Sequence, residues 1–271
     1  MSHAWLIIAH NEFGILQRLV SLLDAPGCDF YIHIDKKVKV LPKLTVSQGN
    51  IYLLTERKDV HWGHISQIET ELLLLRTAMR QGPYEHYHII SGTHLPLKTI
   101  EELQKFFEDH SNEEIMRIWP QDEGDADFKL RRYHLPLRDF KNPIKIVSSL
   151  CQFSWKVVLK FQKVFGLRHL VNERFIKTDN WLSLTESAVR YLVEREKQII
   201  KKYRWSFCGD EYFVASELVA SGNQFKIYDC QRLLYVEFKK ESPRSLSLSE
   251  WDDLRKTDYF FARKFTEKSV V

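Results

Sequence analysis

Residues 4–35, AWLIIAHNEFGILQRLVSLLDAPGCDFYIHID, carry the pattern that decides the fold. The apolar run at 4–9 predicts a strand, and the apolar residues after it repeat every three or four positions, which predicts a helix that ends at Asp24-Ala-Pro-Gly. The run at 29–35 predicts a second strand that ends on the carboxylate of Asp35. The carboxyl ends of strands in such a βαβ unit are where ligands bind, so Asp35 is a candidate site residue by position.

The same alternation continues along the chain. Further strands and helices are expected at 51–54, 66–80, 87–90 and 100–110. Ser66 and Glu69 have the spacing of a capping box at the start of one of these helices. Strands that alternate with helices predict an α/β fold with a central, mostly parallel sheet flanked by helices, and 271 residues fit one large domain.

The composition excludes several classes of protein. Hydrophobic residues make up 44% of the chain, with only 10 Gly and 8 Pro, so a disordered or fibrous protein is excluded. Charges of both signs are mixed at a net charge of +4, which argues against dedicated nucleic-acid binding. The four cysteines contain no CxxC pair, so a reducing compartment is the default. No stretch reaches the roughly 18 apolar residues of a spanning helix.

A basic segment covers residues 141–170. It contains six cations and no acidic residue, and Lys156, Lys160 and Lys163 share one face of a helix. The first interpretation is a solvated face on an amphipathic helix packed against the body. The second is a helix that lies on an anionic membrane, where each cation adds roughly 1 kcal/mol of attraction.

Two acidic residues lie at the start of an expected helix. Residues 181–194 are expected to be helical, and a further helix is expected over 212–220. Asp210 can cap this second helix, which leaves Glu211 in its first turn without a structural role. Glu211 is therefore a candidate for chemistry.

Known chemical motifs are mostly missing. The chain has no GxxxxGK[ST], no GxGxxG after the first strand, no GxSxG and no HExxH, so it is neither a P-loop NTPase nor a dinucleotide-binding domain. One D-x-D, Asp125 and Asp127, lies in an acidic stretch expected to be a solvated loop and not a metal site. Arg263 and Lys264 stand in succession between aromatic residues, which suggests that they bind a diphosphate or an acidic partner.

Seven segments together resemble one known family. They are IAHNEFGILQRLVSLL, FYIHIDKK, DVHWGHISQIETELLLLRTAM, YHIISGTHLPLKT, NWLSLTESAVRYLV, FCGDEYFVASEL and FFARKF. In this order and at these separations they resemble the core-2/I-branching β-1,6-N-acetylglucosaminyltransferase family, which includes the peptide O-xylosyltransferases. The resemblance implies a GT-A-type fold and an inverting transfer of a sugar from a UDP donor to an acceptor hydroxyl, with no cofactor or divalent metal.

The resemblance also implies roles for individual residues. Glu211 would be the general base that takes the proton of the attacking hydroxyl. The other positions are Arg244, Arg263 and Lys264 at the donor diphosphate, His10, Asp35 and Trp62 at the uridine, and Ser91, Gly92, His94, Trp181 and Asp210 near the donor sugar and the acceptor. His94 departs from the Asp common in relatives. We expect a nucleotide-binding half at 1–110 and an acceptor and catalytic half at 111–271.

The chain lacks the signal-anchor and paired cysteines of the eukaryotic members, so it resembles a bacterial member on the cytoplasmic side of the membrane. The expected partners are a UDP-sugar, with GlcNAc or xylose, and a glycan or glycolipid acceptor of surface polysaccharide synthesis. The basic segment suggests peripheral contact with an anionic membrane. The alternatives are a nucleotide-sugar or glycan-binding module without catalysis, and a nucleic-acid or membrane adaptor.

Overall fold

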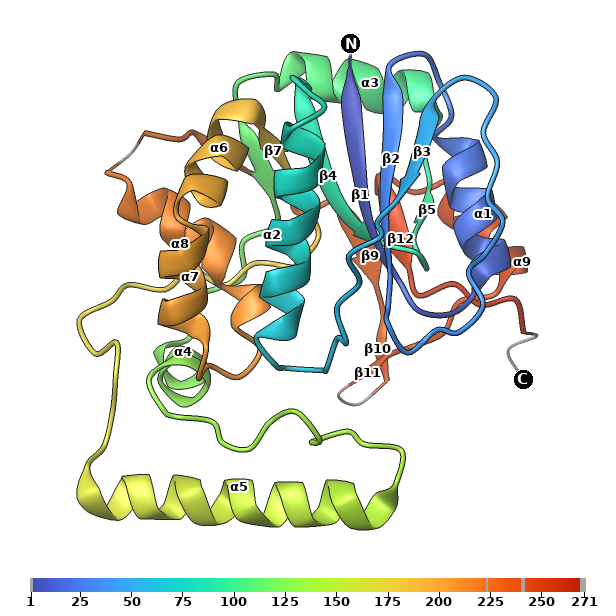
Figure 1. Ribbon diagram of the computed structural model, residues 1–271. Helices are drawn as coiled ribbons and strands as arrows, with labels where there is room; N and C mark the ends of the chain where they lie inside the picture. Colours follow the sequence, from blue (N-terminus) through green and yellow to red (C-terminus); the bar gives the residue numbers. More distant parts are fainter. Residues whose placement is uncertain (1, 223, 240–241, 269–271) are drawn as a thin grey trace.

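A seven-stranded sheet forms the centre of the computed structural model, which describes residues 2–222, 224–239 and 242–268 (Figure 1). Its strands, in spatial order, are β3 (Asn50–Leu53), β2 (Cys28–Ile34), β1 (His3–Ala9), β4 (His86–Ser91), β7 (Leu182–Thr185), β6 (Glu114–Met116) and β8 (Ile227–Asp229). Neighbouring strands are parallel, except that β7 is antiparallel to β4 and β6. The predicted α/β fold with a mostly parallel central sheet is confirmed.

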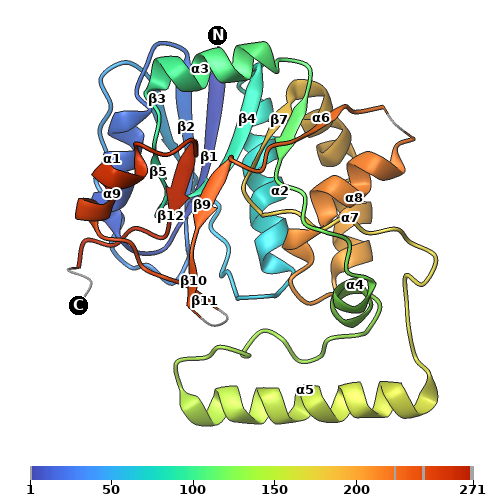
Figure 2. The ribbon, with the colours of Figure 1, turned by 180° about the vertical axis from the view of Figure 1, so that it is seen from behind.

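Strand β1 shows why both faces of the sheet need cover. All seven of its residues are buried, and it pairs in parallel with β2 and β4. An apolar strand of this kind occurs where helices or other layers pack on both faces. Helix α2 (Ser66–Met79) crosses one face in Figure 1, and α3 (Ile100–Asp109) and a small second sheet lie on the other, seen in front in Figure 2. From β1, Trp5 contacts Phe107 of α3 and Phe261 of the second sheet.

The second sheet joins distant parts of the chain. It consists of β5 (Leu95–Pro96), β12 (Phe261–Arg263) and β9 (Leu234–Val236), in that spatial order. Because β12 pairs with β5, the end of the chain lies beside the loop that follows β4. The remaining short pieces are the hairpin β10 (Phe238–Lys239) and β11 (Ser242–Pro243), and helix α9 (Leu248–Leu254).

The other helices flank these sheets. They are α1 (Phe13–Leu22), α4 (Glu123–Leu130), α5 (Lys145–Phe165), α6 (Glu186–Glu194), α7 (Glu196–Tyr203) and α8 (Phe213–Ala220), with a 3₁₀ turn η1 (Gly209–Glu211) before α8. Helix α5 extends along one end of the molecule, beyond the carboxyl ends of β1 and β2 (Figures 1 and 2). Among the described residues, no helix has both the length and the apolar character needed to cross a bilayer.

Two expected caps are wrong. Ser66 forms no capping box, because its hydroxyl accepts a hydrogen bond from the backbone amide of His61 and the helix begins without a side-chain cap. Asp210 does not cap α8; it lies within η1, and Asn180 donates a hydrogen bond to its carboxylate. The side chain of Ser66 is thus bonded to the turn before its helix, and that of Asp210 to a residue 30 positions away in the chain.

Two expected elements are also wrong. The first residues of 181–194 form strand β7, and the helix begins only at Glu186, where Thr185 supplies the cap. Asp125 and Asp127 lie on helix α4 and not in a solvated loop. Asp122 caps this helix by accepting from the amide of Asp125.

Candidate active site

Three strands end at the same edge of the central sheet. His10 follows β1, Asp35 follows β2 and Gly92 follows β4. The amide of Asp35 donates to the carbonyl of Ala9, and the amide of Gly92 donates to the carbonyl of Ile8. Parallel pairing therefore brings these three segments to one place, as the position of Asp35 in the sequence suggested.

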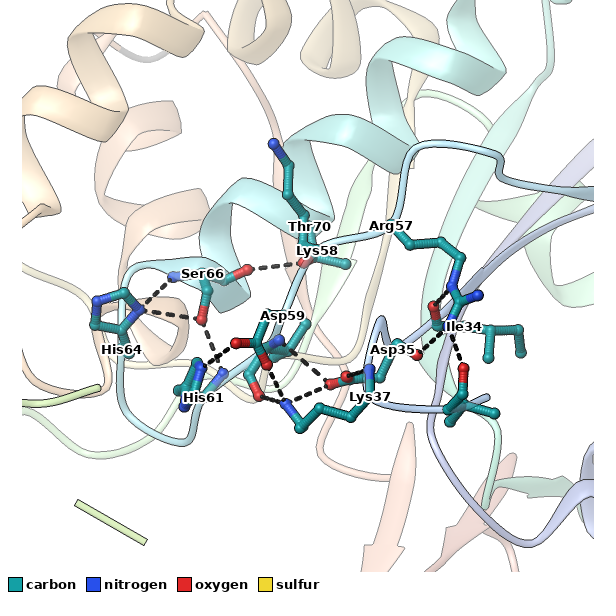
Figure 3. A network of polar contacts seen from close by, with 12 residues as sticks. Ile34, Asp35, Lys37, Arg57, Lys58, Asp59, His61, His64, Ser66 and Thr70 are labelled. Atoms are coloured by element: carbon teal, nitrogen blue, oxygen red, sulfur yellow. Dashed lines mark hydrogen bonds and ion pairs between the residues drawn. The ribbon is translucent and has the colours of Figure 1, made fainter. Parts of the chain in front are cut away.

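Asp35 holds the loop that follows β3 (Figure 3). Its carboxylate accepts from the amide of Lys37 at 2.8 Å and lies 3.0 Å from Nζ of the same lysine, which also bonds Asp59 at 2.8 Å. Arg57 donates to the carbonyl oxygens of Ile34 and Asp35 at 2.9 and 2.7 Å. Asp35, the residue expected at the uridine, thus holds the 57–61 loop in place. The sequence analysis did not identify its partners Lys37, Arg57 and Asp59.

Trp62 stands at the end of this loop and is half exposed. Nζ of Lys141 lies 3.5 Å from the centre of its ring, and the ring of Phe207 meets it edge-on at 5.1 Å. Phe140 is a further neighbour, at 5.9 Å. The aromatic residue expected at the nucleotide is therefore positioned by the segment that leads into α5.

The loop after β4 is closely packed. A Cβ atom at Gly92 would lie 2.7 Å from Cβ of Ala9, so only glycine fits without a shift. The hydroxyl of Ser91 lies 2.7 Å from Nδ1 of His94. The carbonyl of Thr93 accepts from the amide of Phe265, which ties this loop to the segment after β12.

Arg263 is a partly buried cation beside two aromatic side chains. Its guanidinium carbon lies 4.9 Å from the ring centre of Trp181, whose edge faces His94 at 4.9 Å. Burial lowers the pKa of Arg263 to about 10, and burial together with this arginine lowers the pKa of His94 well below its usual value. Nε of Arg263 and Nε2 of His94 are buried without a hydrogen-bond partner among the described residues.

Lys264 brings a second cation to the carboxyl edge. Burial and the neighbouring Arg263 lower its pKa. Lys264 also lies near His10, since burial and this lysine lower the pKa of the histidine while Asp35 raises it. Within the part of the chain that the structure describes, neither Arg263 nor Lys264 forms an ion pair. Asp179 acts on Arg263 and Glu12 on Lys264 only from beyond ion-pair distance, so the two cations are available to bind an anion.

Arg244 differs from these two cations. Its guanidinium bonds Glu237 at 2.7 Å and Glu250 at 2.8 Å. The amide of Leu246, two residues later, donates to the carbonyl of Lys264, so Arg244 lies on the same side of the molecule. Arg244 therefore lies near Arg263 and Lys264, but two carboxylates already neutralise its charge.

Glu211 lies in turn η1 with its side chain 30% exposed. Oε2 is 2.7 Å from Nζ of Lys129 and 3.8 Å from Nζ of Lys177, and its backbone carbonyl accepts from the amide of Thr178. Burial alone would lower the pKa of Lys129, but Glu211 raises it above its usual value. A fixed, partly exposed carboxylate of this kind can accept a proton from a bound hydroxyl.

The two aspartates of the D-x-D motif form ion pairs with lysine and arginine side chains. Asp125 bonds Lys177 at 2.7 Å and Lys129 at 3.3 Å, and Asp127 bonds Arg132 and Arg168 at 3.2 and 2.8 Å. In residues 2–222, 224–239 and 242–268, no cluster of three or more metal-ligating side chains is found. Asp125 instead belongs to the ion-pair network of Glu211. The i,i+4 spacing of Asp125 and Lys129 was its signal in the sequence.

Two further carboxyl groups, the partly buried Asp210 and the buried Glu71, influence each other near Glu211. Burial raises the pKa of Asp210, and the charge of Glu211 adds to this rise. Burial followed by the charge of Asp210 likewise raises the pKa of Glu71 on α2. Asp210 is thus partly buried, with one carboxylate oxygen bonded to Asn180 and the other buried without a partner among the described residues, whereas the Glu211 carboxylate is bonded to Lys129.

Comparison with known proteins shows the family to which the chain belongs. The family model described as "Branch: Core-2/I-Branching enzyme" matches residues 3–260. A human N-acetyllactosaminide beta-1,6-N-acetylglucosaminyl-transferase is 25% identical over 153 residues, which are 54% of this chain and 38% of the human protein. The match thus spans well under half of that relative's length. Since the family model covers nearly all of the chain, the protein belongs to the Core-2/I-Branching enzyme family.

Proposed function

We propose that the protein is an inverting, metal-independent glycosyltransferase that moves a sugar from a UDP donor to a hydroxyl of a glycan acceptor. The observation that carries the proposal is the pair Arg263 and Lys264, cations without ion-pair partners among the described residues. They lie by the loop after β4, where the carboxyl ends of β1 and β2 also meet. Such a pair suits the diphosphate of a nucleotide-sugar.

The chemistry assigns one role to each group. The acceptor hydroxyl gives its proton to the carboxylate of Glu211 as its oxygen forms a bond to C1 of the sugar. On the opposite face the bond from C1 to the UDP oxygen breaks, and UDP leaves with the electron pair. Arg263 and Lys264 stabilise the negative charge that develops on the diphosphate, the task that a metal ion performs elsewhere.

The other site residues follow the same division. His10, Asp35 and Trp62 are assigned to the uridine; they follow β1, β2 and the loop after β3, respectively. Five further residues, Ser91, Gly92, His94, Trp181 and Asp210, are assigned to the sugar and the acceptor, and Arg244 to the diphosphate. The half 1–110 would hold the uridine, and 111–271 would supply the base and the cations at the diphosphate. The residues assigned to the sugar and the acceptor come from both halves.

The donor sugar is GlcNAc in this proposal, because the human relative is named as an N-acetylglucosaminyl-transferase. Xylose is the second candidate, from the resemblance to peptide O-xylosyltransferases. The acceptor is a lipid-linked or surface glycan precursor, handled at the inner face of a bacterial membrane. The four cysteines are all free and buried, which supports a reducing compartment.

A screen of UDP-sugars tests the proposal. The purified protein is incubated with each donor, and release of UDP is measured with and without a mixture of glycan acceptors. We expect turnover with one donor, and stimulation by an acceptor. Tight binding of UDP without turnover of any donor would support the alternative, a nucleotide-sugar or glycan-binding module without catalysis.

A further inference from the structure

Helix α5 presents an unusually large apolar surface to solvent. Six side chains along it, between 51% and 73% exposed, are Ile146, Leu150, Phe153, Val157, Phe161 and Val164. At about 100° per residue they fall within one stripe of the helix. We name this set the apolar row. Contiguous exposed patches of this kind mark interaction surfaces.

A different face of α5 holds it to the body of the protein. Nε1 of Trp155 donates to Nδ1 of His134 at 2.9 Å, and Trp155 packs among Phe140 and Phe207. The side-chain Nε2 of Gln162 donates to the backbone carbonyl of Tyr133 at 2.7 Å. Because these contacts occupy the inner face, the apolar row points away from the body.

The third face of α5 carries positive charge. Lys145, Lys156, Lys160 and Lys163 lie along it, between the inner face and the apolar row. The chain has no acidic residue between Asp139 and Glu173, so nothing on this segment neutralises these lysines. An apolar row next to a cationic row is the arrangement of helices that lie in the interface of anionic bilayers.

This charge pattern separates a bilayer from the other possible occupants. A second copy of the chain, packed with its α5 antiparallel to this one, would place the lysine rows on the same side and so add repulsion between like charges. A neutral bilayer would accept the apolar row but offer no counter-charge to the lysines. An anionic bilayer satisfies both rows at once, because its acyl chains accept the apolar row and its headgroups neutralise the lysines.

We propose that α5 lies in the plane of an anionic lipid bilayer, with the apolar row inserted and the lysines at the headgroups. Phe140 and Lys141, which precede α5, contact Trp62 at the carboxyl edge of the sheet. The bilayer would therefore lie beside the candidate active site and favour an acceptor carried on a lipid. This last step rests on the proposed transferase activity, whereas the binding itself does not.

Vesicle flotation without donor or acceptor tests the binding. The full chain is mixed with vesicles of phosphatidylcholine alone or with one quarter phosphatidylglycerol, at low and high salt. We expect binding to the anionic vesicles that is at least ~10-fold stronger than to the neutral ones and that falls with salt. Equal binding to both compositions, or binding to neither, would overturn the proposal.

Two triple variants test the two rows. Lys156→Glu with Lys160→Glu and Lys163→Glu, and separately Phe153→Ser with Val157→Ser and Phe161→Ser, should each weaken binding at least ~10-fold. Two matched triple variants away from α5 should bind as the unchanged protein does. The control for charge is Lys43→Glu with Lys197→Glu and Lys201→Glu. The control for exposed apolar area is Val40→Ser with Leu41→Ser and Phe238→Ser. Equal losses in variants and controls would contradict a docking role of α5.

A probe on the helix reports insertion directly. The four native cysteines are buried, so Phe153→Cys can be labelled with an environment-sensitive fluorophore. We expect a blue shift of its emission with anionic vesicles, and none for Gln198→Cys on α7. Sedimentation velocity without lipid addresses the second copy: a dimer that the Phe153, Val157 and Phe161 variant dissociates would assign the apolar row to self-association and overturn the proposal.

Discussion

Nζ of Lys129 on α4 lies 2.7 Å from Oε2 of Glu211, and so joins two residues that are 82 positions apart in the chain. Lys129 is largely buried, and Asp125 lies on its other side at 3.3 Å. Asp125 and Glu211 together hold the ammonium group of Lys129 in place, and this group orients the carboxylate of Glu211, the proposed base. Lys129 is a positioning residue in this proposal, since it acts through Glu211.

Loss of the proposed base should separate catalysis from binding. Glu211→Gln keeps the shape of the side chain but removes the proton acceptor, so kcat should fall by at least ~10² while donor affinity changes only a few-fold. Steady-state kinetics and UDP-sugar titration measure both. Glu123→Gln, an exposed glutamate on α4, is the control and should retain activity. A near-normal kcat in Glu211→Gln would remove Glu211 from the mechanism.

The positioning role of Lys129 predicts rescue by a similar side chain. Lys129→Met should lower kcat at least ~10-fold with little change in donor affinity, because Glu211 loses the ion pair that orients it. Lys129→Arg keeps a cation and should restore most of the activity. Equal activity of the Met and Arg variants would show that the charge of Lys129 has no part in the reaction.

The anion site predicts weaker binding of UDP itself. Arg263→Ala and Lys264→Ala should each weaken UDP and UDP-sugar binding together, by roughly 1.5–3 kcal/mol per lost charge-assisted bond. Isothermal titration calorimetry measures this directly. Arg232→Ala and Lys256→Ala, exposed cations outside the site, are the matched controls. Unchanged UDP affinity in both site variants would place the diphosphate elsewhere.

Activity should not depend on a divalent ion. The carboxylates of Asp125 and Asp127 already bond lysines and arginines, and Arg263 and Lys264 are available for the diphosphate. The transfer rate of dialysed protein in excess EDTA should therefore stay close to the untreated rate. Loss of activity in EDTA, with recovery on adding manganese and a matching loss in Asp127→Asn, would mean that the cationic substitute for metal is wrong.

Buried histidines predict a loss of stability in mild acid. Burial lowers the pKa of His3 to about 3, and of His33 and His134 to about 4. The unfolded chain binds protons near pH 6.5 and the folded chain does not, so their contribution is complete above pH 6.5 and declines as the pH falls toward 4. Urea unfolding at several pH values measures the slope.

One histidine allows this slope to be assigned. Nε2 of His33 accepts from the amide of Lys58, and a glutamine there keeps an acceptor without titrating. His33→Gln should therefore reduce the dependence of the unfolding free energy on pH by roughly 1.4 kcal/mol per pH unit between pH 4 and 6.5. An unchanged slope would exclude His33 as a contributor.

Much of the fold could be predicted because its signals are local. The apolar run of β1, the three-to-four-residue repeat of α1 and the carboxylate after β2 lie within 32 consecutive residues, and each is set by neighbours in the chain. The helix expected at 181–194 is wrong in its first part, because a four-residue strand followed directly by a helix has too short a pattern to separate the two. The capping box expected at Ser66 is wrong because the hydroxyl of Ser66 accepts a hydrogen bond from the backbone amide of His61.

The sequence by itself determined the α/β sheet, the family and the residues to suspect, Glu211 and the Arg263-Lys264 pair among them. Only the tertiary structure decided how they are held: Glu211 against Lys129, Arg263 on Trp181, and Asp35 within the loop after β3. It also decided which face of α5 is covered. Ion pairs and packing between residues far apart in the chain depend on how the sheet brings them together, and no local sequence pattern predicts which distant residues will meet.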